Sequence, residues 1–218
     1  LDHTEFLGET LEEVAYEKAG IIKSHSSVVI GPQSTPVIKV LKEIACQRKN
    51  NTYLYSRDWD FKPNHDGSFI LNYQGEMILL PKPNLIGPHQ ISNAAQAAAC
   101  AISQKEFKIN HKNIATGIKE VDWPGRLQKI YLNFPDENIN NQRVWVDGAH
   151  NPNAALNLSK SIKFIEKDSS NYTVLILGML ENKDFISYVK HFNEIIDYLI
   201  CIPVPNCRTS NDPKELKI

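Results

Sequence analysis

The sequence has 218 residues, of which 42% are apolar, enough for a hydrophobic core and too many for a disordered chain. A formal net charge of −1 provides no basic surface to attract nucleic acid or an anionic membrane, so neither is an expected partner. No apolar run is long enough to cross a bilayer, and residues 1–4 (LDHT) do not begin a signal peptide. The four cysteines form no C-x-x-C pair and no disulfide spacing, which predicts reduced thiols in a cytoplasmic protein.

The first half of the chain predicts alternating helices and short strands. Thr10 and Glu13 make a capping-box pattern at the start of a helix that ends at Gly20. Gln74-Gly75 separates two strand patterns and predicts a hairpin. The expected elements, in chain order, are a helix after Thr10, a strand at 27–30, a helix at 36–49, strands at 52–55, 68–73 and 77–80, helices at 90–103 and 111–121, and a strand at 127–132.

The second half begins after a polar stretch at 133–142 (NFPDENINNQ), whose Pro and Asn residues mark the expected domain boundary. Strands and helices then alternate. They are expected at 143–147, 153–166, 173–177, 184–196 and 198–202. This βαβαβ order predicts a parallel sheet with helices on its faces, and the apolar strands at 173–177 and 198–202 predict burial of the sheet.

The most informative motif is Asp147-Gly-Ala-His-Asn-Pro152, which lies where a predicted strand passes into a predicted helix. Ligands of open α/β sheets bind at this end of the strands, and the first turn of the next helix offers free N–H groups to an anion. Asp147 and His150 are therefore candidate site residues. The alternative, that Asp147 and Asn151 only cap the helix, is left equally open by this motif alone.

Four further stretches contain possible ligand-binding residues, each with a purely structural alternative. His3 is a candidate metal or phosphate partner, or a terminal histidine in solvent, and Lys18 is either a site residue or a charge that counters the helix dipole. Asn93 suits a nucleobase edge, or faces solvent. Arg126 follows a Pro-Gly turn and suits phosphate oxygens, or lies on a surface turn. Residues 177–184 follow a strand and form part of a site, or a polar loop with a helix cap.

In their order along the chain, six stretches resemble the folylpolyglutamate synthase/dihydrofolate synthase family of Mur-type ligases. The stretches are LDHTEFLG, EKAGIIK, GPHQISNAA, WPGRLQ, DGAHNP and LGMLENKD. They extend over nearly the whole chain, which favours the functional explanations over the structural ones. The resemblance implies an α/β fold in which residues 1–137 are the remainder of a central ATP-binding ligase domain. Residues 138–218 are then part of a Rossmann-like C-terminal domain with a parallel sheet.

The resemblance implies an ATP-dependent ligase that adds L-glutamate to dihydropteroate or to a folate such as tetrahydrofolate. ATP would phosphorylate the substrate carboxylate, and the glutamate amine would attack the resulting acyl phosphate. The expected cofactors are ATP and Mg²⁺. By position in the motifs, the expected site residues are the metal ligand His3, the catalytic residues Lys18 (carbamylated) and His150, and the ATP ligands Asn93, Arg126 and Asp147.

The family also needs a glycine-rich phosphate loop of the form G-x-x-x-x-G-K-[ST], which does not occur in residues 1–218. The family carries this loop upstream of the first motif. We therefore expect a fragment that is inactive alone and is completed by a separate N-terminal half chain. Two alternatives stay open: a non-catalytic remnant of such a ligase, and a Mur-type peptidoglycan amino-acid ligase.

Overall fold

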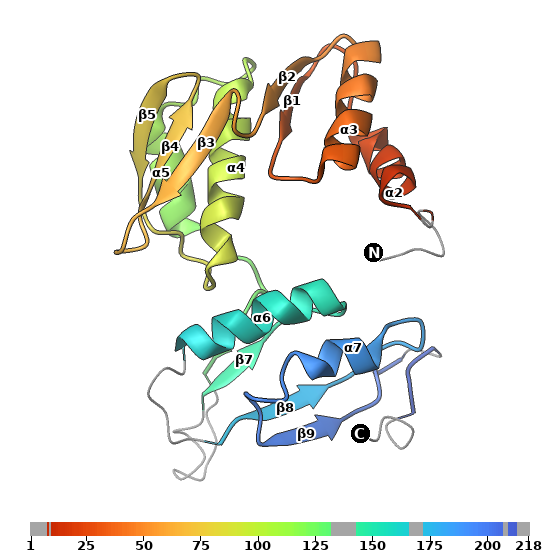
Figure 1. The fold of residues 1–218 in the computed structure, drawn as a ribbon. Coiled ribbons are helices and arrows are strands. Elements are labelled where there is room, and N and C mark those ends of the chain that lie inside the picture. The colour runs from red at the N-terminus through yellow and green to blue at the C-terminus, as the bar shows by residue number, and fades with distance from the viewer. Residues whose placement is uncertain (1–7, 9, 132–142, 166–171, 207–208, 213–218) are drawn as a thin grey trace. The chain divides into compact units, whose positions relative to one another are not determined.

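The computed structural model describes residues 8, 10–131, 143–165, 172–206 and 209–212 (Figure 1). The fold is mixed α/β with parallel and antiparallel sheets, as the sequence predicted. The chain divides into two compact units. The first consists of Leu1–Asn84 and His89–Asp122, and the second of Leu85–Pro88 and Trp123–Ile218. Among the described residues, no helix is both long and apolar enough to cross a membrane.

The first unit alternates helices with short strands, in the order that the sequence predicted. Its elements are α2 (Leu11–Lys18), the 3-10 turn η1 (Ala19–Ile21), β1 (Ser27–Ile30), α3 (Thr35–Gln47), β2 (Asn51–Leu54), β3 (Trp59–Pro63), β4 (Phe69–Tyr73), β5 (Glu76–Leu80), α4 (His89–Ser103) and α5 (His111–Glu120). Strands β1 and β2 pair in parallel. Strands β3, β4 and β5 form an antiparallel sheet, and of these β3 was not predicted from the sequence.

Local sequence signals set two of these elements. The capping box of α2 is present, because Glu13 N–H donates to Thr10 Oγ1 at 3.2 Å and Thr10 N–H donates to Glu13 Oε2 at 3.0 Å. The hairpin between β4 and β5 turns at Gln74 and Gly75, whose φ angles of 51° and 89° are both positive. Such two-residue turns match the twist of the paired strands, which is why the dipeptide predicted the hairpin correctly.

The core of the first unit lies between the antiparallel sheet and helix α4. Trp59, Phe69 and Leu71 of the sheet pack with the alanines of α4. Helices α4 and α5 lie against the same sheet (Figure 1). Small alanine side chains let the helix approach the sheet closely. The N-terminal strand pair is joined to the same helix, because Ser27 Oγ donates to the Ser103 carbonyl oxygen at 2.7 Å.

The second unit contains two separate strand pairs. Its elements are β6 (Gln128–Ile130), β7 (Val144–Val146), α6 (Pro152–Ile165), β8 (Val174–Leu177), α7 (Phe185–Lys190) and β9 (Tyr198–Cys201). Strands β8 and β9 are parallel, as expected. The prediction that β7 joins this parallel sheet is wrong for the described residues, because β7 pairs with β6 and runs antiparallel to it.

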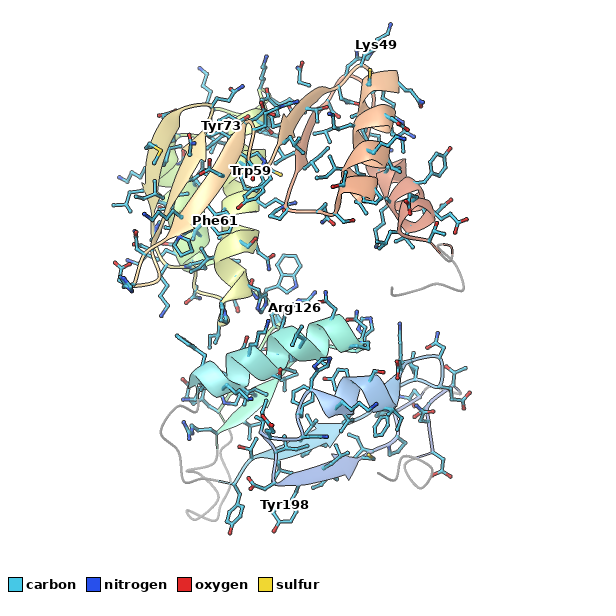
Figure 2. All side chains as sticks on the ribbon, viewed as in Figure 1. Lys49, Trp59, Phe61, Tyr73, Arg126 and Tyr198 are labelled. Carbon is cyan, nitrogen blue, oxygen red and sulfur yellow. The ribbon has the colours of Figure 1, made fainter. Side chains whose placement is uncertain are left out.

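The strand pair β8–β9 is covered by helices on one face. Leu177 and Leu199 pack with residues of α6 and α7, whereas Ile176 and Tyr198 are 61% and 60% exposed. Figure 2 shows Tyr198 pointing away from the helices. The predicted burial of both faces is therefore wrong for the described residues. The apolar pattern was correct, but only α6 and α7 supply a covering layer among the described elements, and both pack on the same side.

The two units differ in extent from the expected domains 1–137 and 138–218. Apart from the short segment Leu85–Pro88, the chain passes from the first unit to the second between Asp122 and Trp123. Strand β6 pairs with β7 and so belongs with the residues that follow it. The polar stretch 133–142 lies outside the described residues. That the first domain is the ATP-binding domain of a ligase stays a prediction.

Candidate functional site

Two of the motifs form one structural feature in the second unit. We use the name composite turn for residues 123–128 (WPGRLQ) together with residues 147–151 (DGAHN). Asp147 joins its two parts, because one carboxylate oxygen accepts from Leu127 N–H at 2.7 Å and the other accepts from Ala149 N–H at 2.8 Å. The pairing of β6 with β7 brings the parts together, since the first turn precedes β6 and the second follows β7.

Two further hydrogen bonds close the composite turn. Gly148 N–H donates to the Gly125 carbonyl oxygen at 2.9 Å, so the backbones of the two parts touch directly. Gly125 N–H donates to Gln128 Oε1 at 3.1 Å, which closes the first part around Arg126. Gln128 was not among the site residues predicted from the sequence, where its only signal is its place in the WPGRLQ stretch.

The backbone on both sides of Arg126 is in the left-handed region. Gly125 has φ +72° and Leu127 has φ +44°. Glycine adopts this conformation freely, but for leucine it costs on the order of 1–3 kcal/mol. The Leu127 side chain is only 5% exposed and belongs to the core of the second unit. Burial of this side chain and the hydrogen bond to Asp147 together hold the strained residue in place.

Arg126 is the basic side chain that this turn presents. Its side chain is exposed, and Figure 2 labels it. A guanidinium group carries five N–H donors in a rigid fork that fits phosphate oxygens. A solvent-accessible arginine whose two neighbouring residues make three hydrogen bonds is suited to bind an anionic group of a ligand.

The rest of the DGAHNP motif leads into helix α6. Asn151 Oδ1 accepts from Ala154 N–H at 2.8 Å, so Asn151 caps the helix. The structural alternative is thus confirmed for Asn151, but Asp147 is not the cap of α6. His150 is exposed, and its Nδ1 lies 3.0 Å from the Gly148 carbonyl oxygen. The tautomer with hydrogen on Nδ1 makes this contact a hydrogen bond.

A buried tyrosine lies near the Asp147 carboxylate. Tyr188 of α7 is 2% exposed, and burial raises its pKa to about 12, with a further contribution from the negative charge of Asp147. A neutral Tyr188 therefore lies near the composite turn at all ordinary pH values.

The LGMLENKD stretch contains the expected helix cap. Asp184 Oδ1 accepts from Ser187 N–H at 3.0 Å at the start of α7, and hydrogen bonds from Ser187 lower the pKa of this carboxyl group. Glu181 N–H donates to the Thr209 carbonyl oxygen, and the Leu180 carbonyl oxygen accepts from the Asn211 side-chain amide. The structural explanation of Asp184 is confirmed, and any contribution of the loop to a site stays a prediction.

Two other candidates lie in the first unit. Lys18 is the last residue of α2 and is exposed, and Asn93 lies on the exposed side of α4, where its Nδ2 donates to Gln90 Oε1 at 3.0 Å. No hydrogen bond or ion pair joins Lys18 to Asn93 in the described part of the chain. Arg48 holds the segment after Lys18, because its guanidinium donates to the carbonyl oxygens of Gly20 and Ile22.

The expected metal ligand His3 lies outside the described residues. Within the described ranges, no group of three or more His, Cys, Asp or Glu side chains could hold a metal ion. The structure thus brings Arg126, Asp147 and His150 together in the composite turn, and describes Lys18 and Asn93 in the other unit. The assignment of roles to these residues stays a prediction.

Comparison with known proteins gives the family. No family model matches the sequence. The chain is 30% identical over 220 residues to the dihydrofolate synthase/folylpolyglutamate synthase of Haemophilus influenzae, an alignment that includes 95% of this chain and 48% of that protein. The chain belongs to the dihydrofolate synthase/folylpolyglutamate synthase family. It spans about half the length of the curated family members that it matches.

Other family members agree with this assignment. The dihydrofolate synthetase of Saccharomyces cerevisiae is 29% identical over 228 residues, which include 100% of this chain and 51% of that protein. Among solved structures, Escherichia coli FolC in complex with DHPP and ADP superposes with a TM-score of 0.80 at 26% identity, over 99% of this chain and 48% of FolC. Sequence and fold therefore point to the same family.

Proposed function

We propose that this chain forms the nucleotide-binding part of an ATP-dependent ligase that adds L-glutamate to dihydropteroate or tetrahydrofolate. Family membership supports this proposal, because FolC was solved with ADP and another neighbour is an FPGS complex with AMPPCP and folate. The observation that carries it is the composite turn, which presents a solvent-accessible arginine from two family motifs joined by Asp147. We propose a cytoplasmic location; Cys46 and Cys100 are free thiols.

The reaction proceeds in two steps. The substrate carboxylate attacks the γ-phosphorus of ATP and releases ADP, which gives an acyl phosphate. The glutamate amine then attacks the acyl carbon, a proton leaves the nitrogen, and phosphate departs as the amide forms. Such transfers are catalysed by positioning and by charge stabilisation more than by covalent chemistry of the protein.

The residues of this chain supply binding and orientation. Arg126 binds phosphate oxygens of the nucleotide, and Asp147 holds the backbone that carries Arg126. Each Asp147 oxygen retains a second lone pair, which is compatible with an additional contact to a nucleotide hydroxyl. Asn93 offers an exposed amide for the nucleobase edge, and His150 lies on the exposed side of the turn.

The described residues offer groups that suit a nucleotide, but they do not offer a set of ligands for Mg²⁺. No described residues form an acidic or histidine cluster, so the described residues do not by themselves make a magnesium site. His3 and carbamylated Lys18 are the metal-binding part of the proposal.

The test is reconstitution. The chain is mixed with a second polypeptide, the half of a family member that this chain does not match and that carries a phosphate loop. ATP-dependent incorporation of labelled glutamate into dihydropteroate and tetrahydrofolate is measured for the chain alone and for the mixture. We expect background incorporation from the chain alone, turnover from the mixture, and loss of that turnover with Arg126→Ala.

The outcomes separate the proposal from its alternative. ADP binding by the chain is measured in parallel by titration. An inactive mixture together with no ADP binding by the chain would identify a non-catalytic remnant. Turnover by the chain alone, well above the blank, would show that no phosphate loop from another polypeptide is needed.

A further inference from the structure

The strained turn around Arg126 contains a residue whose role is not assigned. Gln128 is half-buried at the start of β6, and its Oε1 accepts the Gly125 N–H at 3.1 Å. This bond links the residue before Arg126 to the second residue after it. We propose that Gln128 is a positioning residue that holds Arg126 toward the phosphate groups of a nucleoside di- or triphosphate. The inference rests on the proposed function, in which Arg126 contacts those phosphates.

We call the hydrogen bond between Gly125 N–H and Gln128 Oε1 the clamp. The backbone geometry around Arg126 explains why it matters. Arg126 lies between Gly125 and Leu127, which both have positive φ angles. A leucine keeps this conformation only where the surrounding structure over-determines it, and such strain is concentrated at functional sites. Glycine at position 125 adds flexibility, because it populates both signs of φ about equally. The Gly125 carbonyl oxygen is held by Gly148 N–H, and Gln128 supplies the acceptor that fixes the N–H side of this glycine.

Gln128 is well placed to supply that acceptor. It is the first residue of β6, and it lies opposite Val146 in the β6–β7 ladder. Val146 directly precedes Asp147, which holds Leu127 from the other side. The residues on both sides of Arg126 are thus tied to one strand pair, Gly125 through Gln128 and Leu127 through Asp147.

This arrangement has a functional consequence. Arginine loses much side-chain freedom on binding, so a fixed backbone direction lowers the cost of forming a bidentate contact. A site residue held by its neighbours is preorganised for its ligand. Loss of the clamp should therefore weaken binding of the phosphate groups and leave binding of the nucleoside unchanged.

The experiment compares ADP with adenosine. Both are titrated into the 218-residue chain and into Gln128→Met, which removes the acceptor at nearly constant volume. We expect ADP to bind about three- to tenfold more weakly to the variant and adenosine to bind equally to both. Gln104→Met is the matched control, because Gln104 also holds a loop through backbone contacts, to Ala101 and Phe107, but in the first unit.

A double-mutant cycle tests whether Gln128 acts through Arg126. In an Arg126→Ala background, Gln128→Met should cause no further loss of ADP affinity. Independent, additive losses would overturn the proposal, and so would equal losses for ADP and adenosine. Amide hydrogen exchange of Gly125 should be faster in Gln128→Met and should return to the original rate in Gln128→Glu, which keeps an acceptor.

Different results would overturn the proposed function and the positioning role of Gln128. If the original chain binds no ADP, the proposed nucleotide-binding role is wrong. Hydrogen exchange of the Gly125 amide then tests the hydrogen bond to Gln128 by itself. Unchanged exchange of the Gly125 amide in Gln128→Met would overturn the clamp. If ADP binds and Arg126→Ala weakens it but Gln128→Met does not, the proposed function stands and the positioning role is wrong.

Discussion

The Asp147 carboxylate accepts hydrogen bonds from the protein's own backbone, in addition to any contact with a ligand. It accepts one N–H from each part of the composite turn, at 2.7 Å from Leu127 and 2.8 Å from Ala149. Hydrogen bonds to a charged acceptor are stronger than those between neutral groups. The side chain that resembles a nucleotide ligand in the sequence is therefore also the residue that joins two motifs 20 positions apart.

Tyr188 provides a pH test of the core near this turn. Its folded pKa is about 12, above the unfolded value near 10, so its stabilising effect is complete below pH 10 and is lost as pH rises toward 12. We expect the stability of the second unit to fall by roughly 2 kcal/mol over this interval. Tyr188→Phe should remove that decline.

The measurement is urea unfolding of the second unit at pH 9 to 12. Tyr172→Phe is the control, because Tyr172 is 78% exposed and its substitution should leave the pH dependence unchanged. The same decline in Tyr188→Phe would show that another group in the second unit is responsible.

Lys18 is a second residue whose role can be tested in the reconstituted enzyme. A carbamate forms only on a primary amine, so neither Lys18→Ala nor Lys18→Arg should support turnover, although each should fold. A short carboxylate such as formate should partly restore Lys18→Ala. Lys23→Ala is the control, because Lys23 is an exposed lysine of the same segment. Near-normal turnover of Lys18→Arg would exclude the carbamate and leave Lys18 as a helix-end charge.

Among the elements, β8 shows how one strand can have two different environments. Successive side chains of a strand point to opposite faces. Leu177 is 6% exposed in the core of the second unit, whereas its neighbour Ile176 is on the uncovered face. The apolar composition of the strand is the same on both faces, and only the packing distinguishes them.

This difference predicts unequal costs for two adjacent substitutions. Leu177→Ala should destabilise the second unit by about 2–4 kcal/mol, because it leaves a cavity in a packed core. Ile176→Ala should cost less than about 1 kcal/mol, because a side chain that stays in water loses little on truncation. Urea unfolding of both variants provides the comparison. A loss for Ile176→Ala as large as for Leu177→Ala would show that this face is covered in solution.

At the scale of the whole molecule, the strand pairing and the polar stretch 133–142 indicate different boundaries between the two parts of the chain. The pairing of β6 with β7 places residues on both sides of that stretch in one unit. A protease that cuts within 133–142 should therefore not separate the chain into two free domains.

Limited proteolysis tests this expectation. We expect the first cut within residues 133–142, as their polar composition with Pro and Asn predicts. The two fragments should then elute together in gel filtration under native conditions and separate only in denaturant. Fragments that separate without denaturant would place the domain boundary at 137/138, and a first cut within α4 or β7 would contradict the expected accessibility.

The sequence alone determined the local elements. The capping box at Thr10, the Gln74-Gly75 turn and the alanine-rich helix were predictable, because each depends on residues close together in the chain. The order of six motifs was sufficient to identify the family. Strand β3 was missed although Trp59 and Phe61 alternate with charged residues, because the pattern is short and ends at Pro63, and its pairing with β4 is not visible in the sequence.

Tertiary structure decided what the local pattern left open. The partner of β7 is β6, and the described helices cover a single face of β8–β9, because long-range pairing and packing choose among arrangements with the same apolar pattern. The sequence marked Arg126 and Asp147 as separate candidates. Only the fold shows that Asp147 and Gln128 hold the backbone around Arg126, because hydrogen bonds between distant segments form only after the strands that carry them have paired.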